Sequence, residues 1–403
     1  MKRTLFPAAL LALAAACVHP PAIPPSEPPT QPVQPSPPAE PQPPAPPAAP
    51  PAVPPEKPGT GAEAPRAAAP IEFAFVGDVM LGSSFPDETG GMLPPDDGAH
   101  LLDEVAPVLR AADVAFGNLE GPLVDSGTSE KCARSKPGRC YAFRVPTRYG
   151  KHLAAAGFDV VSVANNHAGD FGEAGRASTR ATLDALGIRH AGAPGEVARL
   201  EVRGTRIAVV AFATSSGTND LRDVDEAVRI VKAAREGADL VVVSFHGGAE
   251  GADRQHVPRG HEEFLGEDRG DVRAFAHAVV DAGADLVVGH GPHVVRGMEL
   301  YRGRLVAYSL GNFATYGGFN LSGPNGLSAI LAVRLAPDGA FLGGRIVPAR
   351  QERPGGPHLD PAGAILPVVR RLSEEDFGAS AARIGDDGSI APPAAPATAR
   401  EGS

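Results

Sequence analysis

The stretch DLVVGHGPHVVRGMELYRGRLVAYSLGNF, residues 285–313, is the part of the chain that points most directly to its fold. An apolar run at 286–288 is typical of a buried strand, and the loop GHGPH after it places His290 and His293 just past the strand end. In open α/β sheets, ligands bind outside the carboxyl ends of the strands, where glycines let the backbone approach a bound group closely. Two histidines in such a loop favour a metal or phosphate site over ordinary loop histidines.

Working outward from this stretch, apolar runs predict strands, and apolar residues spaced by three and four predict helices. The predicted strands are 71–76, 113–117, 158–164, 207–212, 240–245, 286–288, 305–310, 327–335 and 345–347. The predicted helices are 100–112, 148–156, 172–186, 224–236 and 271–282. Asp271 is a plausible amino-terminal cap for the last of these helices. This alternation predicts a layered α/β domain of about three hundred residues.

Polar side chains follow the carboxyl ends of several predicted strands. They are Asp78, Glu120, Asn166, His246, His290 and His293. Parallel pairing would bring them all to one edge of the sheet. Each alone has a structural explanation, such as a turn aspartate or a hydrogen-bonded core histidine, but their joint placement is typical of a metal site. Carboxylate, amide and imidazole ligands together suit Mn, Fe, Zn or Mg, with one ion or with two bridged by a carboxylate.

The residues at the amino terminus have the features of an export signal. In residues 1–17, Lys2 and Arg3 precede an apolar segment too short to span a bilayer, and small residues lead to Cys17 as in a bacterial lipobox. This pattern predicts a lipoprotein anchored to a membrane of the cell envelope through acylated Cys17. Secretion without lipid is the alternative, because Ala14 stands where a lipobox more often has Leu. In both cases we expect the protein to act outside the cytoplasm.

The composition of both ends differs from that of the middle of the chain. Proline and alanine dominate residues 18–70, where large apolar residues are almost absent. Such a segment cannot form a core, so we expect a disordered, semi-rigid tether. A similar bias predicts a disordered tail at 381–403. The folded domain is therefore expected at 71–380.

Cysteine content and net charge limit the class of protein further. Cys132 and Cys140 flank a polar, basic loop, and no further soft zinc ligands lie nearby, so a disulfide is the economical interpretation outside the cytoplasm. The formal net charge is −10. Because no broad basic stripe is available to neutralise phosphates, the sequence argues against a nucleic-acid partner.

Six ordered blocks of the sequence resemble the CapA family of capsule and poly-γ-glutamate synthesis proteins, whose domain is similar to the calcineurin-like metallophosphatases. The blocks are FVGDVMLG (75–82), NLEGPLV (118–124), VSVANNHAGDFG (161–172), SFHGGAEG (244–251), GHGPHVVRGMELYRG (289–303) and YSLGNF (308–313). The resemblance covers residues 71 to about 350 and implies a metallophosphatase-like domain.

The resemblance also implies roles for individual residues. Asp78 would be the opening aspartate and Glu120 the bridging carboxylate, and the further implied metal ligands are Asn166, His246, His290 and His293. The implied catalytic residues are His167, which would protonate the leaving group, and Asn165. The implied substrate-binding residues are Asn118, Arg296 and Asn312, which would hold an anionic oxygen.

The chain departs from the family patterns at three places. The opening motif of the metallophosphatases has a metal-binding histidine two positions after the aspartate, and Met80 stands at that position here. His290 and His293 are three positions apart, whereas the usual closing motif has a spacing of two. Gly247 replaces the tryptophan that often follows the histidine of that block in the family. These departures leave the number of bound ions open.

Two functions are consistent with the sequence. The first is a metal-dependent hydrolase or transferase that acts on a phosphate ester or an acidic polymer at the cell envelope. The second is a non-catalytic subunit that binds an anionic polymer such as poly-γ-glutamate during export or assembly, together with membrane subunits for polymer synthesis. A complete metal site would favour the enzyme, and an empty or single-ion site would favour the binding protein.

Overall fold

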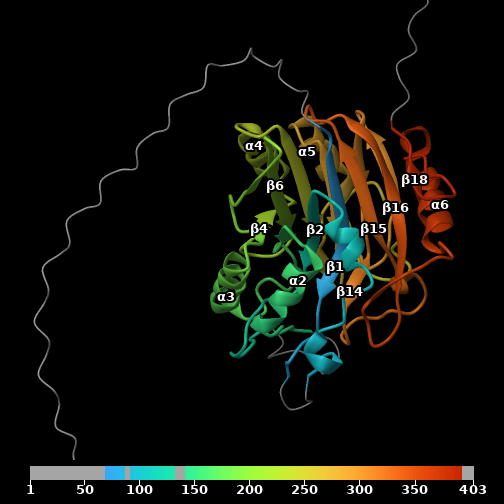
Figure 1. Cartoon of the computed structure of the whole chain (residues 1–403). Helices are drawn as coiled ribbons and strands as arrows, with labels where there is room; N and C mark the ends of the chain where they lie inside the picture. The colour runs from blue at the N-terminus through green and yellow to red at the C-terminus, as the bar shows by residue number, and fades with distance from the viewer. Residues whose placement is uncertain (1–68, 87–90, 132–140, 393–403) are drawn as a thin grey trace, which may run out of the picture. The chain divides into compact units, whose positions relative to one another are not determined.

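The computed structural model of the protein describes residues 69–86, 91–131 and 141–392 (Figure 1). Three predictions fall outside the described residues: the lipidation of Cys17, the disulfide between Cys132 and Cys140, and nearly all of the tether at 18–70. No helix among the described residues combines the length and the apolar character that a membrane span requires.

The first sheet contains both ends of the described chain. Its members are β1 (Ile71–Met80), β2 (Val114–Leu119), β3 (Val160–Ser162), β4 (Arg189–Ala191), β14 (Asn312–Thr315), β15 (Leu327–Leu335), β16 (Phe341–Gln351), β17 (Pro357–Leu359) and β18 (Ser389–Ile390). The strand order is β17-β16-β15-β1-β2-β3-β4, with β14 paired to β1 and β18 to β16. Strands β1 to β4 are parallel, whereas β15 and β16 are antiparallel to their neighbours.

The second sheet consists of strands from the middle of the chain. They are β5 (Ala198–Val202), β6 (Thr205–Ala213), β7 (Asn219–Asp220), β8 (Leu240–His246), β11 (Leu286–His290), β12 (Met298–Tyr301) and β13 (Arg304–Ala307). Their order is β12-β13-β11-β8-β6-β5, with β7 beside β6. Strands β6, β8, β11 and β13 are parallel. A separate two-stranded sheet pairs β9 (Glu263–Phe264) with β10 (Glu267–Asp268).

The α-helices are α1 (Ala106–Arg110), α2 (Gly150–Ala156), α3 (Gly172–Ala185), α4 (Val224–Arg235), α5 (Val272–Asp281) and α6 (Ile365–Phe377). Helices α1 to α5 cover the outer faces of the two sheets, whereas buried residues of α6 belong to the core between the sheets. Buried residues of α1, α2 and α3 join one face of the first sheet, and those of α4 and α5 join one face of the second. The predicted cap of α5 is confirmed, because the Asp271 side chain accepts a hydrogen bond from the backbone nitrogen of Ala274.

The alternation of side chains along the strands explains how the layers stack. In β6, Ile207 and Val209 join a core that also contains Phe73 of β1 and Leu331 of β15, so this core lies between the two sheets. The alternate residues Ala208 and Val210 point the other way and pack with the α4 and α5 side. Because successive side chains of a strand face opposite sides, each central strand is apolar on both faces. The result is a helix–sheet–sheet–helix arrangement, which confirms the predicted α/β class.

The structure corrects three details of the sequence-based assignment. The predicted helix at 100–112 is shorter, because residues 99–105 form turns and α1 begins at Ala106 with a proline in its first turn. The folded part continues past residue 380, since Ile384 and Ile390 are buried and β18 pairs with β16. The predicted single edge of one sheet is wrong, because the strands divide between two sheets.

Candidate metal centre

Strand ends of both sheets meet at one place in the interior. In the first sheet, Asp78 of β1 lies opposite Asn118 of β2 and opposite Asn312 of β14. In the second sheet, His290 of β11 lies opposite His246 of β8. Parallel pairing therefore places equivalent strand ends side by side, with carboxylates from one sheet and imidazoles from the other.

Two glycines allow the backbone to approach closely around this site. A Cβ atom on Gly77 would lie 1.9 Å from the carbonyl oxygen of Gly311, which accepts a hydrogen bond from the backbone nitrogen of Asp78 at 2.9 Å. A Cβ on Gly289 would lie 2.2 Å from the carbonyl oxygen of Tyr308. No larger residue fits at either position without displacing backbone, so both glycines fix the strand ends that carry Asp78 and His290.

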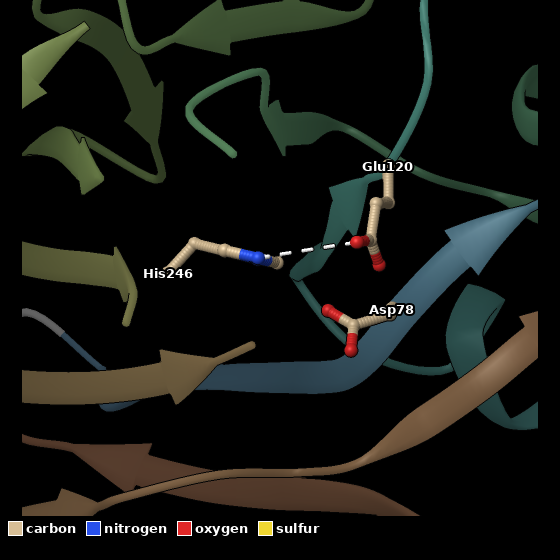
Figure 2. A group of neighbouring side chains, drawn as sticks. All are labelled: Asp78, Glu120 and His246. Carbon is tan, nitrogen blue, oxygen red and sulfur yellow. Dashed lines mark ion pairs between the residues drawn. The ribbon is translucent and has the colours of Figure 1, made fainter. Parts of the chain in front are cut away.

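Asp78, Glu120 and His246 form the centre of the site. Each offers a ligand atom, and these atoms all lie within 4.8 Å of one another. Figure 2 shows the three side chains pointing toward a common point, with His246 Nε2 3.9 Å from Glu120 Oε1. All three side chains are buried, with exposed fractions of 1% or less. Two buried carboxylates beside a buried imidazole need a compensating positive charge.

The two histidines of the GHGPH loop complete the cluster. His290 Nδ1 lies 3.6 Å from Asp78 Oδ1. His293 Nδ1 lies 3.0 Å from Asp78 Oδ2, and its Nε2 lies 3.6 Å from Glu120 Oε1. Both predicted ligands are therefore next to the centre.

Several ligand atoms in the cluster have no hydrogen-bond partner among the residues that the structure describes. They are both carboxylate oxygens of Glu120, Oδ1 of Asn166, Nε2 of His246, and both ring nitrogens of His290. Buried polar atoms are nearly always hydrogen-bonded, and leaving them unpaired is costly. A divalent cation would satisfy these oxygen and nitrogen donors together, so the residues present fit a metal ion.

The ionisation of the cluster agrees with a site for a cation. Burial, together with the charges of Asp78 and Glu250, raises the pKa of Glu120 well above its usual value. Burial lowers the pKa of His290 to about 4, and burial followed by the charge of Arg269 lowers that of His246. Both imidazoles are thus neutral, which is the form that binds metals.

His293 has the opposite shift. Burial alone would lower its pKa, but the carboxylates of Glu120, Asp78 and Glu250 raise the pKa of His293 to about 10. In the protein without a metal ion, the His293 imidazolium is therefore the positive charge that offsets the buried carboxylates. A divalent ion in the cluster would replace this charge and favour neutral His293 as a further ligand.

His167 lies beside the cluster and is held by a carboxylate. Because a carboxylate only accepts hydrogen bonds, His167 Nδ1 donates to Asp170 Oδ2 at 2.7 Å, which leaves Nε2 facing Glu120 Oε1 at 3.9 Å. The ring stacks on Phe143 with 4.2 Å between centroids, and Lys131 Nζ donates to Asp170 Oδ1 at 2.7 Å. Burial lowers the pKa of His167. This arrangement fixes the ring with one nitrogen directed toward the candidate metal centre.

Three predicted asparagines orient the cluster. Asn118 Nδ2 donates to Asp78 Oδ1 at 2.8 Å and lies 3.2 Å from His246 Nδ1, so it connects the two sheets. Asn165 donates to Asn118 Oδ1 and accepts from the backbone nitrogen of His167. Asn312 Oδ1 lies 3.1 Å from His293 Nδ1. These contacts fit positioning roles.

The structure corrects the role predicted for Arg296. Its side chain is fully buried, and its two terminal nitrogens donate to the two carboxylate oxygens of Glu262 at 2.8 and 2.7 Å. The remaining donor groups contact the carbonyl oxygens of Ala249 and Arg254. Because all three of its nitrogens are bonded to protein oxygens, Arg296 stabilises the loop after β8, which argues against the predicted role in binding an anionic substrate oxygen.

Sequence reasoning missed four polar residues at the site, namely Lys131, Asp170, Glu250 and Arg269. Glu250 Oε1 lies 3.4 Å from Asn166 Nδ2, and its Oε2 lies 3.8 Å from His293 Nε2. Asp170 belongs to the block VSVANNHAGDFG together with its partner His167, and Glu250 belongs to the block SFHGGAEG together with the predicted ligand His246, so these blocks could have identified both residues. No comparable sequence signal marks Lys131 or Arg269.

Met80 occupies the position of the missing second ligand of the opening motif. It is fully buried and belongs to the apolar core on the α1 to α3 side of the first sheet. The backbone nitrogen of Gly82 lies 3.3 Å from its sulfur. The thioether packs as a core side chain, so β1 contributes only Asp78 to the cluster.

The chain matches a known protein family over residues 72–316; this family is described as the bacterial capsule synthesis protein PGA_cap. The "PGA biosynthesis protein CapA" of Bacillus subtilis is 30% identical over 261 residues, covering 60% of this chain and 63% of that relative. The "Capsule biosynthesis protein CapA" of Bacillus anthracis is 28% identical over 283 residues, covering 63% of this chain and 64% of that relative. The chain thus spans slightly less than two thirds of either relative.

Among solved structures, a putative 5'-nucleotidase from Staphylococcus aureus in complex with alpha-ketoglutarate is similar to the chain. The TM-score is 0.37 and the sequence identity is 12%, over 72% of this chain and 53% of that protein. This similarity is too low to assign a role to any residue of the site.

Proposed function

The chain belongs to the family of bacterial capsule synthesis proteins, and from this premise we propose that it takes part in making or exporting an anionic polymer of the poly-γ-glutamate type at the cell envelope. We also propose that its candidate metal centre is a hydrolytic site for a phosphate ester or for the polymer itself. The names of the two Bacillus relatives, which refer to PGA and capsule biosynthesis, support the process. The geometry of the site supports the chemistry.

One observation carries the hydrolytic proposal. The site contains buried metal-ligand atoms without a hydrogen-bond partner among the described residues, from Glu120, Asn166, His246 and His290. They lie next to His167, which Asp170 orients. A purely structural cluster would pair these atoms with one another or with the backbone. A set of metal ligands beside an oriented acid or base is the combination that metal-assisted hydrolysis requires.

A divalent ion held by this cluster would supply a Lewis acid that polarises a phosphoryl or carbonyl oxygen. The protein residues supply the proton transfer. In the neutral His167 ring the proton is on Nδ1, so Nε2 takes a proton from the attacking water, Asp170 stabilises the resulting imidazolium through Nδ1, and Nε2 then gives that proton to the leaving-group oxygen. Lys131 neutralises the second oxygen of Asp170 and keeps that carboxylate in place. Asn118 and Asn312 hold Asp78 and His293 in their orientations.

A groove of about 490 Å³ borders the cluster at Asn166. Basic side chains in its lining belong to Lys131, Arg176 and Arg222, and Glu267 and Asp268 line it as well. Lys131 Nζ donates to the carbonyl oxygen of Asn166, so this end of the groove lies against the candidate metal centre. We propose that an anionic chain reaches the site through this groove, past the guanidinium of Arg176, whereas Lys131 and Arg222 are already paired with Asp170 and Asp220.

A non-catalytic binding function is the second candidate, and one observation favours it. Met80 contributes a core side chain where the metallophosphatase motif has a ligand, so the cluster has fewer ligands than that motif supplies. In this alternative, the ion and the groove hold the polymer without cleaving it. The two candidates differ in turnover, and an empty or single-ion site would favour the binding function.

The location of the protein in the cell envelope is predicted from residues 1–17 of the sequence. We propose that Cys17 is acylated and that residues 18–70 hold the folded domain away from the membrane, near membrane subunits for polymer synthesis. Expression of the full chain with labelled palmitate should label the wild type and leave Cys17→Ser unlabelled. Equal labelling of both proteins would exclude Cys17 as the lipidated residue.

Hydrolysis by the full chain is the test of the proposed enzyme. Purified protein loaded with Mn²⁺ should cleave a generic phosphodiester such as bis(p-nitrophenyl) phosphate or shorten poly-γ-glutamate, and a chelator should abolish the activity. His167→Ala should keep the metal and lose the turnover. A protein that retains metal and binds the polymer, but cleaves neither substrate, would support the binding function instead.

A further inference from the structure

A buried arginine outside the metal-ligand set lies one carboxylate away from it. Arg269 is 1% exposed, and its Nη1 donates to Glu250 Oε1 at 2.8 Å. The Glu250 carboxylate also approaches two of the candidate ligands, with Oε1 3.4 Å from Asn166 Nδ2 and Oε2 3.8 Å from His293 Nε2. Glu250 therefore links the guanidinium directly to the candidate metal centre.

The rest of the Arg269 guanidinium is not used by the described part of the chain. Its Nε and Nη2 atoms are buried and have no hydrogen-bond partner among the described residues. Arg296, the other large buried arginine nearby in the sequence, has all three of its nitrogens bonded to protein oxygens. A permanently charged guanidinium with two unpaired nitrogens is unfavourable in an interior unless a ligand completes it.

The two unpaired atoms form one edge of the guanidinium, where two N–H bonds run parallel. This chain uses the same edge elsewhere to hold a carboxylate. Arg206 contacts Asp239 through Nε at 3.1 Å and Nη2 at 2.7 Å, and Arg222 contacts Asp220 through Nε at 2.9 Å and Nη2 at 2.7 Å. The free edge of Arg269 therefore matches a ligand with two coplanar anionic oxygens.

We propose that Arg269 binds an oxyanion of the substrate, a carboxylate or a phosphate, through Nε and Nη2 beside the candidate metal centre. The proposal rests on the proposed function, because the metal centre marks where the substrate lies. Glu250 fixes the guanidinium in advance, so little side-chain freedom is lost when the anion binds. Arg269 thus selects substrates that have an anionic group close to the bond at the metal centre, as a polyglutamate chain or a phosphate ester has.

Anion binding by the metal-loaded full chain tests this role. Isothermal titration with inorganic phosphate and with glutarate distinguishes a phosphate from a carboxylate ligand. We expect the wild type to bind at least one of them, and Arg269→Lys, which keeps the charge and loses the parallel edge, to bind it at least tenfold more weakly. Arg254→Gln is the matched control and should leave the affinity unchanged, since the exposed Arg254 guanidinium forms an ion pair with the neighbouring Asp253.

Metal content and thermal unfolding of each variant separate this proposal from the previous one. Arg269→Lys should keep the wild-type metal content and remain folded. Suppose that neither the wild type nor Arg269→Lys contains metal, and that the variant still binds the anion more weakly. This result would support the role of Arg269 and contradict the metal centre. Equal affinity of folded wild type and Arg269→Lys for both anions, or binding of neither anion by the wild type, would overturn the role of Arg269.

Discussion

His293 has a left-handed backbone conformation, with φ of 57°. A residue with a side chain adopts this conformation at a cost, and it persists where the surroundings fix it. Its ring contacts Asp78 and Asn312 through Nδ1 and faces Glu120 through Nε2. Its carbonyl oxygen accepts hydrogen bonds from the side chains of Asn312 and Asn325. The strain is therefore balanced by contacts that aim the imidazole at the cluster.

The proton transfer by His167 leads to the first prediction. His167→Ala should keep its metal, because the ring is oriented as an acid, and should lose hydrolysis by about a hundredfold or more. His256→Ala is the control, since that exposed histidine pairs with Asp376 and should hydrolyse the substrate at the wild-type rate. Steady-state rates with a phosphodiester and metal analysis of the same samples measure both effects. Loss of metal from His167→Ala would instead make His167 a ligand.

The buried pair of Arg296 and Glu262 leads to the second prediction. Arg296→Met leaves the Glu262 carboxylate buried without its partner and should lower the free energy of unfolding by about 3–5 kcal/mol. The exposed pair of Arg206 and Asp239 provides the control, because Arg206→Met should cost less than about 1 kcal/mol. Urea denaturation monitored by circular dichroism measures both. A small loss for Arg296→Met would show that this pair does not hold the loop after β8.

These arginines illustrate what the sequence could not reveal about the site. Arg296 lies inside a conspicuous sequence block, whereas Arg269 lies outside all of them. Arg296 is paired with Glu262, 34 positions away in the chain, and Arg269 is paired with Glu250, 19 positions away. These partners determine how many nitrogens of each guanidinium are hydrogen-bonded. Local patterns carry no information about such pairing. The strand-end residues were predictable because the parallel topology alone brings them together.

At the scale of elements, strands and helices with a strong periodicity were predictable. The segments at 207–212, 240–245 and 286–288 are apolar on both faces, and they lie in β6, β8 and β11. The sequence did not reveal β14, because its four residues are too few to show a period. The helix α6 was also missed, although its buried residues Ile365, Leu366, Val369, Leu372 and Phe377 recur at helical spacing and could have predicted it. Short elements depend on their neighbours in the fold, which local patterns do not encode.

The third prediction concerns α5, which packs behind the histidine-bearing strands. Asp271 caps its first turn, so Asp271→Ala should lower the free energy of unfolding by about 1 kcal/mol. Asp271→Asn is the matched control, because an asparagine side chain also accepts the hydrogen bond and should retain most of the stability. Equal denaturation midpoints for the alanine and asparagine variants would mean that the cap contributes little.

At the scale of the whole molecule, the candidate metal centre joins two separate sheets. The sequence predicted one edge of one sheet, because alternating strands and helices do not reveal where a sheet divides. In the structure, Asp78 and Glu120 come from the first sheet, whereas His246 and His290 come from the second. An ion bound to all four would connect the two halves of the folded unit.

This connection leads to the fourth prediction. An ion that binds only the folded protein stabilises it by about 2.7 kcal/mol when its free concentration is a hundred times Kd. Removing the metal with a chelator should therefore lower the unfolding temperature by roughly 4 °C, and adding Mn²⁺ or Zn²⁺ should restore it. Differential scanning calorimetry of the full chain with chelator, with metal and with metal plus excess chelator measures the shift. An unchanged unfolding temperature in all three would contradict an ion between the sheets.

The most direct test of the central claim is the metal content of purified full-length wild type and His246→Ala, measured by elemental mass spectrometry. His246 is buried at the centre of the cluster, and its Nε2 has no hydrogen-bond partner among the described residues. The account predicts at least one divalent ion per wild-type chain and a near-complete loss of it in a folded His246→Ala variant. Equal metal content in the two proteins, with circular dichroism showing both folded, would mean that the joined strand ends are not a metal centre.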